Sequence, residues 1–142
     1  MKKIKFSKIA ISSTSKDKRV GLIASQIYEI LQNKDCKIFH DDTLNKISKS
    51  LKSEYRNKKY ILNNCELIIA IGGDGRILNC SRKYGSQGLP ILGINLGKLG
   101  FLSDIAPKDL TNDLLEVIKG NFIKDSRFFL STKINNKTEF LA

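Results

Sequence analysis

The chain has 142 residues, of which 41% are hydrophobic and 27% charged, so its composition is that of one folded globular domain and excludes a disordered or collagen-like chain. Lysine and arginine number 25 against 14 aspartates and glutamates, and the net charge of +11 favours an anionic partner without choosing among nucleic acid, lipid headgroups and nucleotides. No apolar run reaches the ~18–20 residues of a membrane-spanning helix, and the basic start lacks the apolar core of a signal peptide, so we expect a cytoplasmic protein with no membrane partner.

The three cysteines and the single histidine do not form a metal-binding pattern. Cys36, Cys65 and Cys80 lie in or beside apolar runs, without the CxxC or Cys/His spacing of zinc sites. His40 is the only histidine, which excludes a pair of catalytic histidines and a histidine-based metal site. We therefore expect structural roles for all four residues and no protein-bound metal.

A lysine-rich stretch lies at Lys46–Lys59, with Tyr55 and Tyr60 within or beside it. Aromatic rings beside positive charge can stack on bases. A solvated lysine-rich surface accounts for the same pattern, and we favour that interpretation. No nucleic-acid partner is therefore expected.

Strand-like and helix-like segments alternate along the first sixty residues. Lys8–Ser12 is a short apolar run typical of a buried strand, and Cys36–His40 is a second short strand. Apolar residues at steps of three and four predict an amphipathic helix between them, through Val20, Ile23, Ala24, Ile27, Ile30 and Leu31. The spacing of leucine and isoleucine predicts a weak surface helix over residues 42–60.

The alternation continues in the second half of the chain. Leu67–Ile71 is an uninterrupted run rich in β-branched residues, as expected of a central parallel strand covered on both faces. A helix at Arg76–Tyr84 and another strand at Pro90–Asn95 follow. A further helix begins at Pro107 and ends before Gly120, the usual order of proline and glycine around a helix.

Alternating strands and helices predict an α/β fold in which an open parallel sheet carries helices on both faces. The last residues differ, because Arg127–Ile134 and Thr138–Ala142 have the pattern of an antiparallel hairpin around Asn135-Asn136. We therefore expect an α/β nucleotide-binding domain over residues 1–124, followed over residues 125–142 by the first strands of a β-rich second domain.

The segment Gly72-Gly73-Asp74-Gly75 follows the central strand directly. Glycines let backbone N–H groups approach an anion, and the N-terminus of the next helix adds its dipole. Because a carboxylate repels phosphate, Asp74 is explained there as a base for an attacking hydroxyl or as a ligand of a divalent cation. The simpler interpretation is a strand-to-helix turn in which Asp74 caps the helix. The segment is neither the dinucleotide fingerprint, since Leu78 occupies the third glycine position, nor a P-loop.

A second glycine-bearing loop, Gly93–Leu102, follows the next strand. Asn95 offers an amide and Phe101 an aromatic ring, although Phe101 could equally lie in the core. Ligands of open α/β sheets bind beyond the carboxyl ends of the strands, where both loops should lie. Together the two loops predict a nucleotide-binding cleft.

The two loops together resemble the NAD kinase family, with Gly-Gly-Asp-Gly at residues 72–75 and Gly-Ile-Asn-x-Gly-x-Leu-Gly-Phe-Leu-x-Asp at residues 93–104. The first motif is shared with phosphofructokinases and with diacylglycerol and sphingosine kinases, whereas the second is more specific. The resemblance implies a Rossmann-like domain of the NAD kinase and phosphofructokinase type. It also implies transfer of a phosphoryl group from ATP, with Mg²⁺, to the adenosine 2′-hydroxyl of NAD, and a homo-oligomer for the full-length protein.

The same resemblance assigns the site residues. Asp74 would be the catalytic base that deprotonates the 2′-hydroxyl. Arg76 stands where the family commonly has threonine, and Asn79 where it often has arginine, so both contacts would differ here. The residues expected to bind the nucleotides are Gly72, Gly73, Gly75, Arg76, Asn79, Asn95, Leu99, Gly100 and Phe101.

The sequence departs from the family at its end. Family members continue into a β-rich domain that begins with an Asn-Glu or Asn-Asp motif, and this sequence stops at Leu141-Ala142. We therefore expect a fragment or a natural truncation with little activity by itself. Two other classes stay open: a lipid kinase of the diacylglycerol or sphingosine type, in which the second motif has no place, and a non-catalytic nucleotide-binding module.

Overall fold

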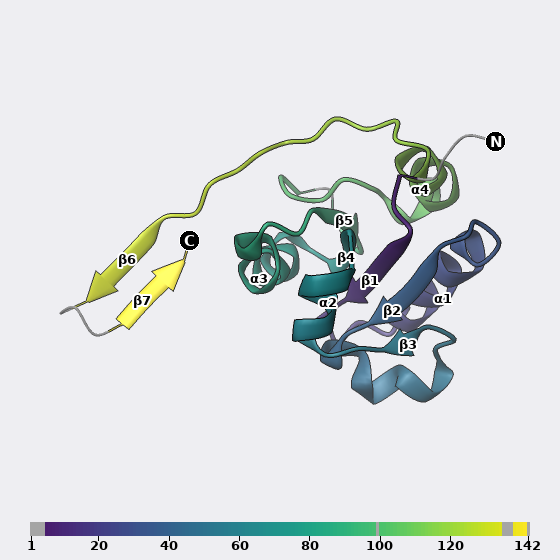
Figure 1. Ribbon diagram of the computed structural model, residues 1–142, viewed down its shortest axis with the longest axis horizontal. Helices are drawn as coiled ribbons and strands as arrows, with labels where there is room; N and C mark the ends of the chain where they lie inside the picture. Colours follow the sequence, from purple (N-terminus) through teal and green to yellow (C-terminus); the bar gives the residue numbers. More distant parts are fainter. Residues whose placement is uncertain (1–4, 99, 135–137, 142) are drawn as a thin grey trace.

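The computed structural model describes residues 5–98, 100–134 and 138–141. Five parallel strands form one sheet in the order β3-β2-β1-β4-β5 (Figure 1). The strands are β1 (Lys8–Ser12), β2 (Lys37–His40), β3 (Glu54–Tyr55), β4 (Leu67–Gly72) and β5 (Ile91–Asn95). The order reverses between β1 and β4, as in doubly wound folds.

Strand β4 is an interior strand of the sheet, between β1 and β5, and its apolar sequence predicts a strand that is covered on both faces. Every residue of β4 is buried, because β1 and β5 pair with its two edges and helices cover its two faces. The pairing with β5 is parallel and places Gly72 opposite Asn95. The predicted meeting of the two glycine loops at one edge of the sheet is therefore confirmed.

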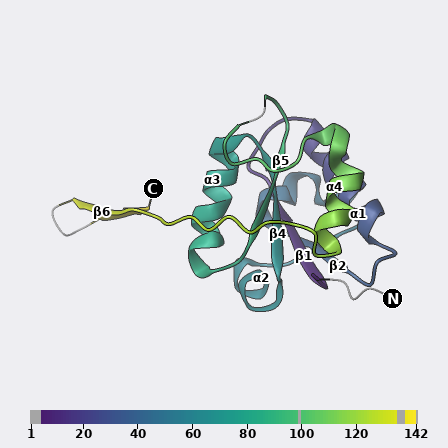
Figure 2. The same cartoon turned by 90° about the horizontal axis from the view of Figure 1, so that it is seen from above.

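Helices cover both faces of the sheet (Figure 2). Helices α1 (Arg19–Leu31) and α4 (Leu110–Ile118) pack on the face that carries Ile9 and Ile11 of β1. Helices α2 (Lys58–Asn64) and α3 (Asp74–Lys83) pack on the other face, which carries Ala10. Successive strand residues point to opposite faces, so the continuous apolar strands supply both cores. The predicted α/β fold is confirmed.

The single surface helix predicted over residues 42–60 is wrong. The segment consists of a 3-10 helix, η1 (Asp42–Ser50), then strand β3, then the start of α2. Asp41 caps η1 by accepting a hydrogen bond from the backbone N–H of Thr43 at 3.0 Å. Asn57 caps α2 in the same way, with its side chain accepting from the N–H of Tyr60 at 2.9 Å. These two local caps and the pairing of β3 with β2 divide the segment, which spacing alone does not reveal.

The predicted start and end of the fourth helix are confirmed. Pro107 opens the short 3-10 helix η3 (Pro107–Asp109), which leads into α4. Gly120 follows α4 with a φ of +91°, a left-handed conformation that glycine adopts without strain. Among the described residues, no helix combines the length and apolar character needed to cross a membrane.

The chain then runs as an extended segment away from the sheet and ends in a hairpin (Figure 1). Strand β6 (Ser131–Ile134) pairs antiparallel with β7 (Thr138–Leu141). The strand predicted to begin at Arg127 begins instead at Ser131, which pairs with Leu141, the last described residue of β7. The predicted turn at Asn135-Asn136 lies outside the described residues. The division into two domains near residue 125 stays a prediction.

Candidate functional site

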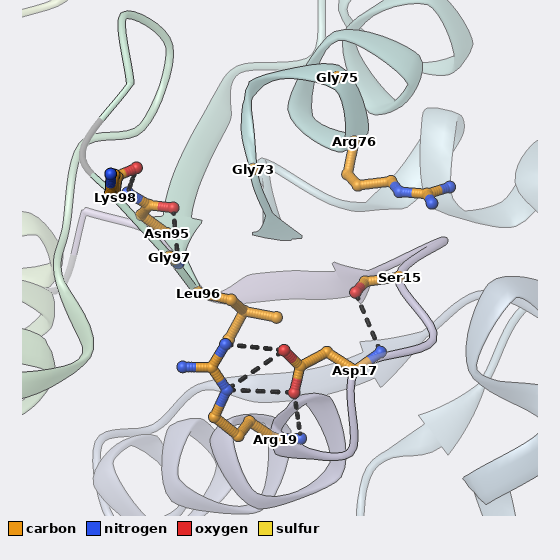
Figure 3. Close-up of a pocket in the computed structure, with 10 residues that line it drawn as sticks. All are labelled: Ser15, Asp17, Arg19, Gly73, Gly75, Arg76, Asn95, Leu96, Gly97 and Lys98. Carbon is orange, nitrogen blue, oxygen red and sulfur yellow. Dashed lines mark hydrogen bonds and ion pairs between the residues drawn. The ribbon is translucent and has the colours of Figure 1, made fainter.

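A cavity of about 410 Å³ lies beyond the carboxyl ends of β1, β4 and β5. Three loops surround it: the loop from β1 to α1, the turn from β4 to α3, and the loop after β5 (Figure 3). This is the point where the strand order reverses, which is where doubly wound sheets bind their ligands. The lining residues are Ser15, Asp17, Arg19, Gly73, Gly75, Arg76, Asn95, Leu96, Gly97 and Lys98.

Asp74 is the first residue of α3 and joins the two glycine motifs. The N-cap residue of α3 is Gly73, and no side chain caps the helix. The alternative in which Asp74 is the cap is therefore wrong. The Asp74 carboxylate instead accepts hydrogen bonds from the second loop, from the N–H of Phe101 at 2.7 Å and from the N–H of Leu102 at 3.1 Å. Its position in the first turn also places a negative charge near the positive end of the helix dipole. The geometry therefore fixes the Asp74 carboxylate against the second loop. Its neighbours Gly73 and Gly75 line the cavity, whereas Asp74 itself does not.

Two glycines allow these close approaches. A β-carbon at Gly100 would overlap the carboxylate of Asp74. Gly72 has a φ of +152°, and a β-carbon there would lie 2.6 Å from the Cβ atom of Arg76. Both positions therefore require glycine: Gly100 beneath the side chain of Asp74, and Gly72 beneath that of Arg76.

The loop after β5 is closed at its base by Asp104. One Asp104 carboxylate oxygen accepts a hydrogen bond from the N–H of Gly93 at 2.7 Å, and burial raises the pKa of this carboxyl group. The backbone N–H of Asn95 donates to the carbonyl of Ile105 at 2.9 Å, which holds the returning chain beside β5. The loop that binds Asp74 is therefore fixed at both ends.

The amide of Asn95 organises the turn inside this loop. The side chain is buried, its oxygen accepts from the N–H of Gly97 at 3.0 Å, and its nitrogen donates to the carbonyl of Lys98. These bonds bring Gly97 and Lys98 to the wall of the cavity, as Figure 3 shows. The contribution of Asn95 to the cavity is thus made through the shape of the loop.

Positive charge predominates around the cavity. Arg19, Arg76 and Lys98 line it, and Asp17 is the one acidic residue among the lining side chains. Asp17 forms an ion pair with Arg19 at 2.7 Å, and hydrogen bonds from Arg19 lower the pKa of Asp17 to about 2. Arg76 and Lys98 thus remain to attract an anion. An anionic partner is what the excess of lysine and arginine predicts.

The part of the chain that the structure describes holds no cluster of three or more histidine, cysteine or acidic side chains suited to a metal ion. The donor set at the cavity therefore does not fit a metal held by protein groups alone. Magnesium bound to nucleotides is held largely by phosphate oxygens and water. A magnesium ion that arrives with a nucleotide does not require such a cluster.

The predicted binding residues divide into two groups. Gly73, Gly75, Arg76 and Asn95 line the cavity. The others are not in its lining: Gly72 and Gly100 lie beneath Arg76 and Asp74, Asn79 is exposed farther along α3, Phe101 is 93% exposed, and Leu99 lies outside the described residues. The alternative that Phe101 belongs to the core is wrong. The binding roles of both groups stay predictions.

Sequence reasoning missed the loop between β1 and α1, which supplies Ser15, Asp17 and Arg19. Ligands of open α/β sheets bind beyond the carboxyl ends of the strands, and this loop follows a buried strand just as the two glycine loops do. That position in the sequence could have identified it. Leu96, Gly97 and Lys98 were missed only as individual residues, since they lie inside the predicted second loop.

Comparison with known proteins decides the family. Residues 12–122 match the family described as the ATP-NAD kinase N-terminal domain. The chain belongs to the NAD kinase family. The NAD kinase of Nitrosococcus oceani is 30% identical over 134 residues, which are 94% of this chain and 46% of that protein. The NAD kinase of Marinobacter nauticus is 46% identical over 86 residues, or 61% of this chain and 29% of that protein.

A solved structure shares the fold. The crystal structure of yeast NADH kinase in complex with NADH superposes with a TM-score of 0.69 at 20% sequence identity, covering 95% of this chain and 45% of the yeast chain. The present chain thus spans less than half the length of these two NAD kinases and of the yeast NADH kinase. The family match favours NAD kinase over the lipid kinases that share the first motif.

Proposed function

We propose that this chain forms the nucleotide-binding domain of an NAD kinase that transfers the γ-phosphoryl group of ATP to the adenosine 2′-hydroxyl of NAD, giving NADP and ADP. The observation that carries the proposal is the place of Asp74, which begins α3 between Gly73 and Gly75, two residues that line the cavity together with Arg76 and Lys98. Membership of the NAD kinase family supports this reaction.

Asp74 serves as the general base in this proposal. The N–H groups of Phe101 and Leu102 orient its carboxylate by binding one oxygen each. A carboxylate has about four acceptor positions, so each oxygen can accept one more hydrogen bond. The 2′-hydroxyl donates to one of these positions and gives its proton to Asp74 as its oxygen bonds to the γ-phosphorus. The bond from that phosphorus to the bridging oxygen breaks, and ADP leaves.

The cavity binds the phosphates of the donor. Helix α3 directs its N-terminal N–H groups toward this region, and helix N-termini attract phosphate. Arg76 and Lys98 add positive charge on different loops. Magnesium, carried by the nucleotide, would neutralise the phosphate oxygens during transfer.

We further propose a cytoplasmic location, a homo-oligomer for the full-length protein, and no nucleic-acid or membrane partner. Cys36, Cys65 and Cys80 are all free thiols, which suits a reducing compartment. Burial raises the pKa values of all three thiols, which disfavours their thiolate forms near neutral pH.

The test is an assay of NADP formation from NAD, ATP and magnesium. The 142-residue chain is assayed alone and after fusion to the remaining part of the Nitrosococcus oceani NAD kinase, in place of the 134 residues that it matches. We expect ATP-dependent NADP formation by the fusion protein. A folded fusion that binds NAD but forms no NADP would contradict the proposal and favour a non-catalytic nucleotide-binding module.

A further inference from the structure

Arg76 is a cation that the fold positions at the cavity without neutralising it. The side chain is exposed, and the ion pairs found among the described residues do not include it. Its Nη1 atom donates one long hydrogen bond, 3.4 Å, to the hydroxyl of Thr14 in the loop between β1 and α1. Arg19, by contrast, is neutralised by Asp17.

The path of the Arg76 side chain is set by Gly72. The Cβ and Cγ atoms of Arg76 lie 2.6 and 2.9 Å from the place that a β-carbon of Gly72 would occupy. The stem therefore packs on the bare backbone at the end of β4. Arg76 lines the cavity, and Figure 3 shows its side chain leaving α3 on the side of Ser15, with the guanidinium group directed away from Asn95 and Lys98.

Arg76 is also close in sequence to the reacting groups of the proposed mechanism. It lies two residues after Asp74, in the same first turn of α3. The phosphate nearest Asp74 during the reaction is the one that is transferred. The planar guanidinium group can make two parallel hydrogen bonds to such a phosphate.

We propose that Arg76 binds the terminal phosphate of the phosphoryl donor and thereby makes the cavity selective for nucleoside triphosphates over diphosphates. This inference rests on the proposed function. On binding, the guanidinium exchanges its long hydrogen bond to Thr14 for contacts with the γ-phosphate. The product ADP has no γ-phosphate, so Arg76 does not retain it.

The experiment measures dissociation constants of the 142-residue chain for ATP, ADP and inorganic tripolyphosphate by isothermal titration calorimetry. Arg76→Gln removes the charge, and Arg76→Lys keeps the charge but removes the planar pair of donors. Lys59→Gln is the matched control, because Lys59 is an exposed residue of α2, outside the lining of the cavity, and its loss changes the net charge equally. Thermal melts followed by circular dichroism establish that each variant is folded.

We expect Arg76→Gln to weaken binding of ATP and of tripolyphosphate at least tenfold, about the effect of losing one charged hydrogen bond, and binding of ADP by no more than about twofold. Arg76→Lys should fall between the wild type and Arg76→Gln, and Lys59→Gln should match the wild type. The inference is overturned if Arg76→Gln weakens ATP and ADP equally, if it weakens neither, or if the wild type does not bind tripolyphosphate.

The outcomes separate this inference from the proposed function. Selective loss of ATP affinity in Arg76→Gln, without NADP formation by the fusion protein, would support the triphosphate contact and refute the NAD kinase reaction. NADP formation by the fusion protein, together with unchanged ATP affinity in Arg76→Gln, would support the NAD kinase reaction and refute the triphosphate contact.

Discussion

The carboxylate of Asp74 lies against the backbone of Gly100 so closely that a β-carbon at position 100 would come within 2.5 Å of its Oδ2 atom. The contact joins the first turn of α3 to the loop after β5, two segments that are 26 residues apart. The hydrogen bonds from Phe101 and Leu102 to Asp74 depend on this approach. Gly100 thus has a steric role, and Asp74 has both an acceptor role and a structural one.

Replacing Gly100 with alanine should separate the loop from Asp74. We expect Gly100→Ala to lower the free energy of unfolding by about 1–3 kcal/mol, because hydrogen bonds to a charged group are lost. The backbone amides of Phe101 and Leu102 should exchange faster with solvent, as hydrogen exchange followed by NMR would show.

Gly97→Ala is the matched control for that variant. A β-carbon at Gly97 meets no atom within 4 Å, so alanine should leave both the stability and the exchange of these amides nearly unchanged. Equal effects of the two substitutions would show that the close contact between Asp74 and Gly100 is not what holds the loop.

Asp74→Asn should lower kcat far more than it weakens the binding of NAD. In the fusion protein we expect kcat to fall about 10²–10⁴-fold, the usual effect of losing a positioned general base, with a much smaller rise in KM for NAD. Steady-state kinetics with NAD as the varied substrate measure both quantities. Turnover near that of the wild type would refute the role of Asp74, and a rise in KM alone would assign it to binding.

Tyr84→Phe should destabilise the fold at the other end of α3. The Tyr84 hydroxyl donates to the fully buried carboxylate of Asp41 at 2.7 Å, and Lys83 forms an ion pair with the same oxygen at 3.2 Å. Burial raises the pKa of Tyr84, so its hydroxyl remains a donor. We expect a loss of about 1.5–3 kcal/mol in chemical denaturation. Tyr55→Phe, at a tyrosine that is 45% exposed on β3, should cost much less.

His40 should make the protein less stable as the pH falls below about 6.5. Burial lowers the pKa of His40 below its ordinary value of 6.5, and among the described residues its Nε2 atom has no hydrogen-bond partner. The unfolded chain therefore binds a proton at a higher pH than the folded chain does, so stability is lost as the pH falls through that range. Because His40 is the only histidine, its single NMR signal should titrate below pH 6.5.

The control for the pH effect is His40→Gln, which cannot titrate. Between pH 7 and pH 5 the melting temperature of the wild type should fall more steeply than that of His40→Gln. Parallel curves for the two proteins would show that the histidine is not the source of the acid sensitivity.

The sequence by itself determined the class of fold and the place of the two glycine loops. Leu67–Ile71 is apolar at every position and rich in β-branched residues, which is typical of a parallel strand with both faces covered. Gly72 and Asn95 each end a strand of this kind, so parallel pairing brings their loops to one edge. These features are local, because they depend on the period of apolar residues and on where glycine interrupts it.

Only the tertiary structure decided which groups meet at that edge. The hydrogen bonds of Asp74 with Phe101 and Leu102, and the neighbouring place of Arg19, depend on strand order and on loop closure. The exposure of Phe101 was equally undetermined, since an aromatic residue in a glycine-rich loop can face either way. These contacts join residues distant in the chain, and no local spacing encodes them. These contacts are determined by the pairing between strands and by the close approach of side chains to glycine backbone. Both arise only when the sheet has formed.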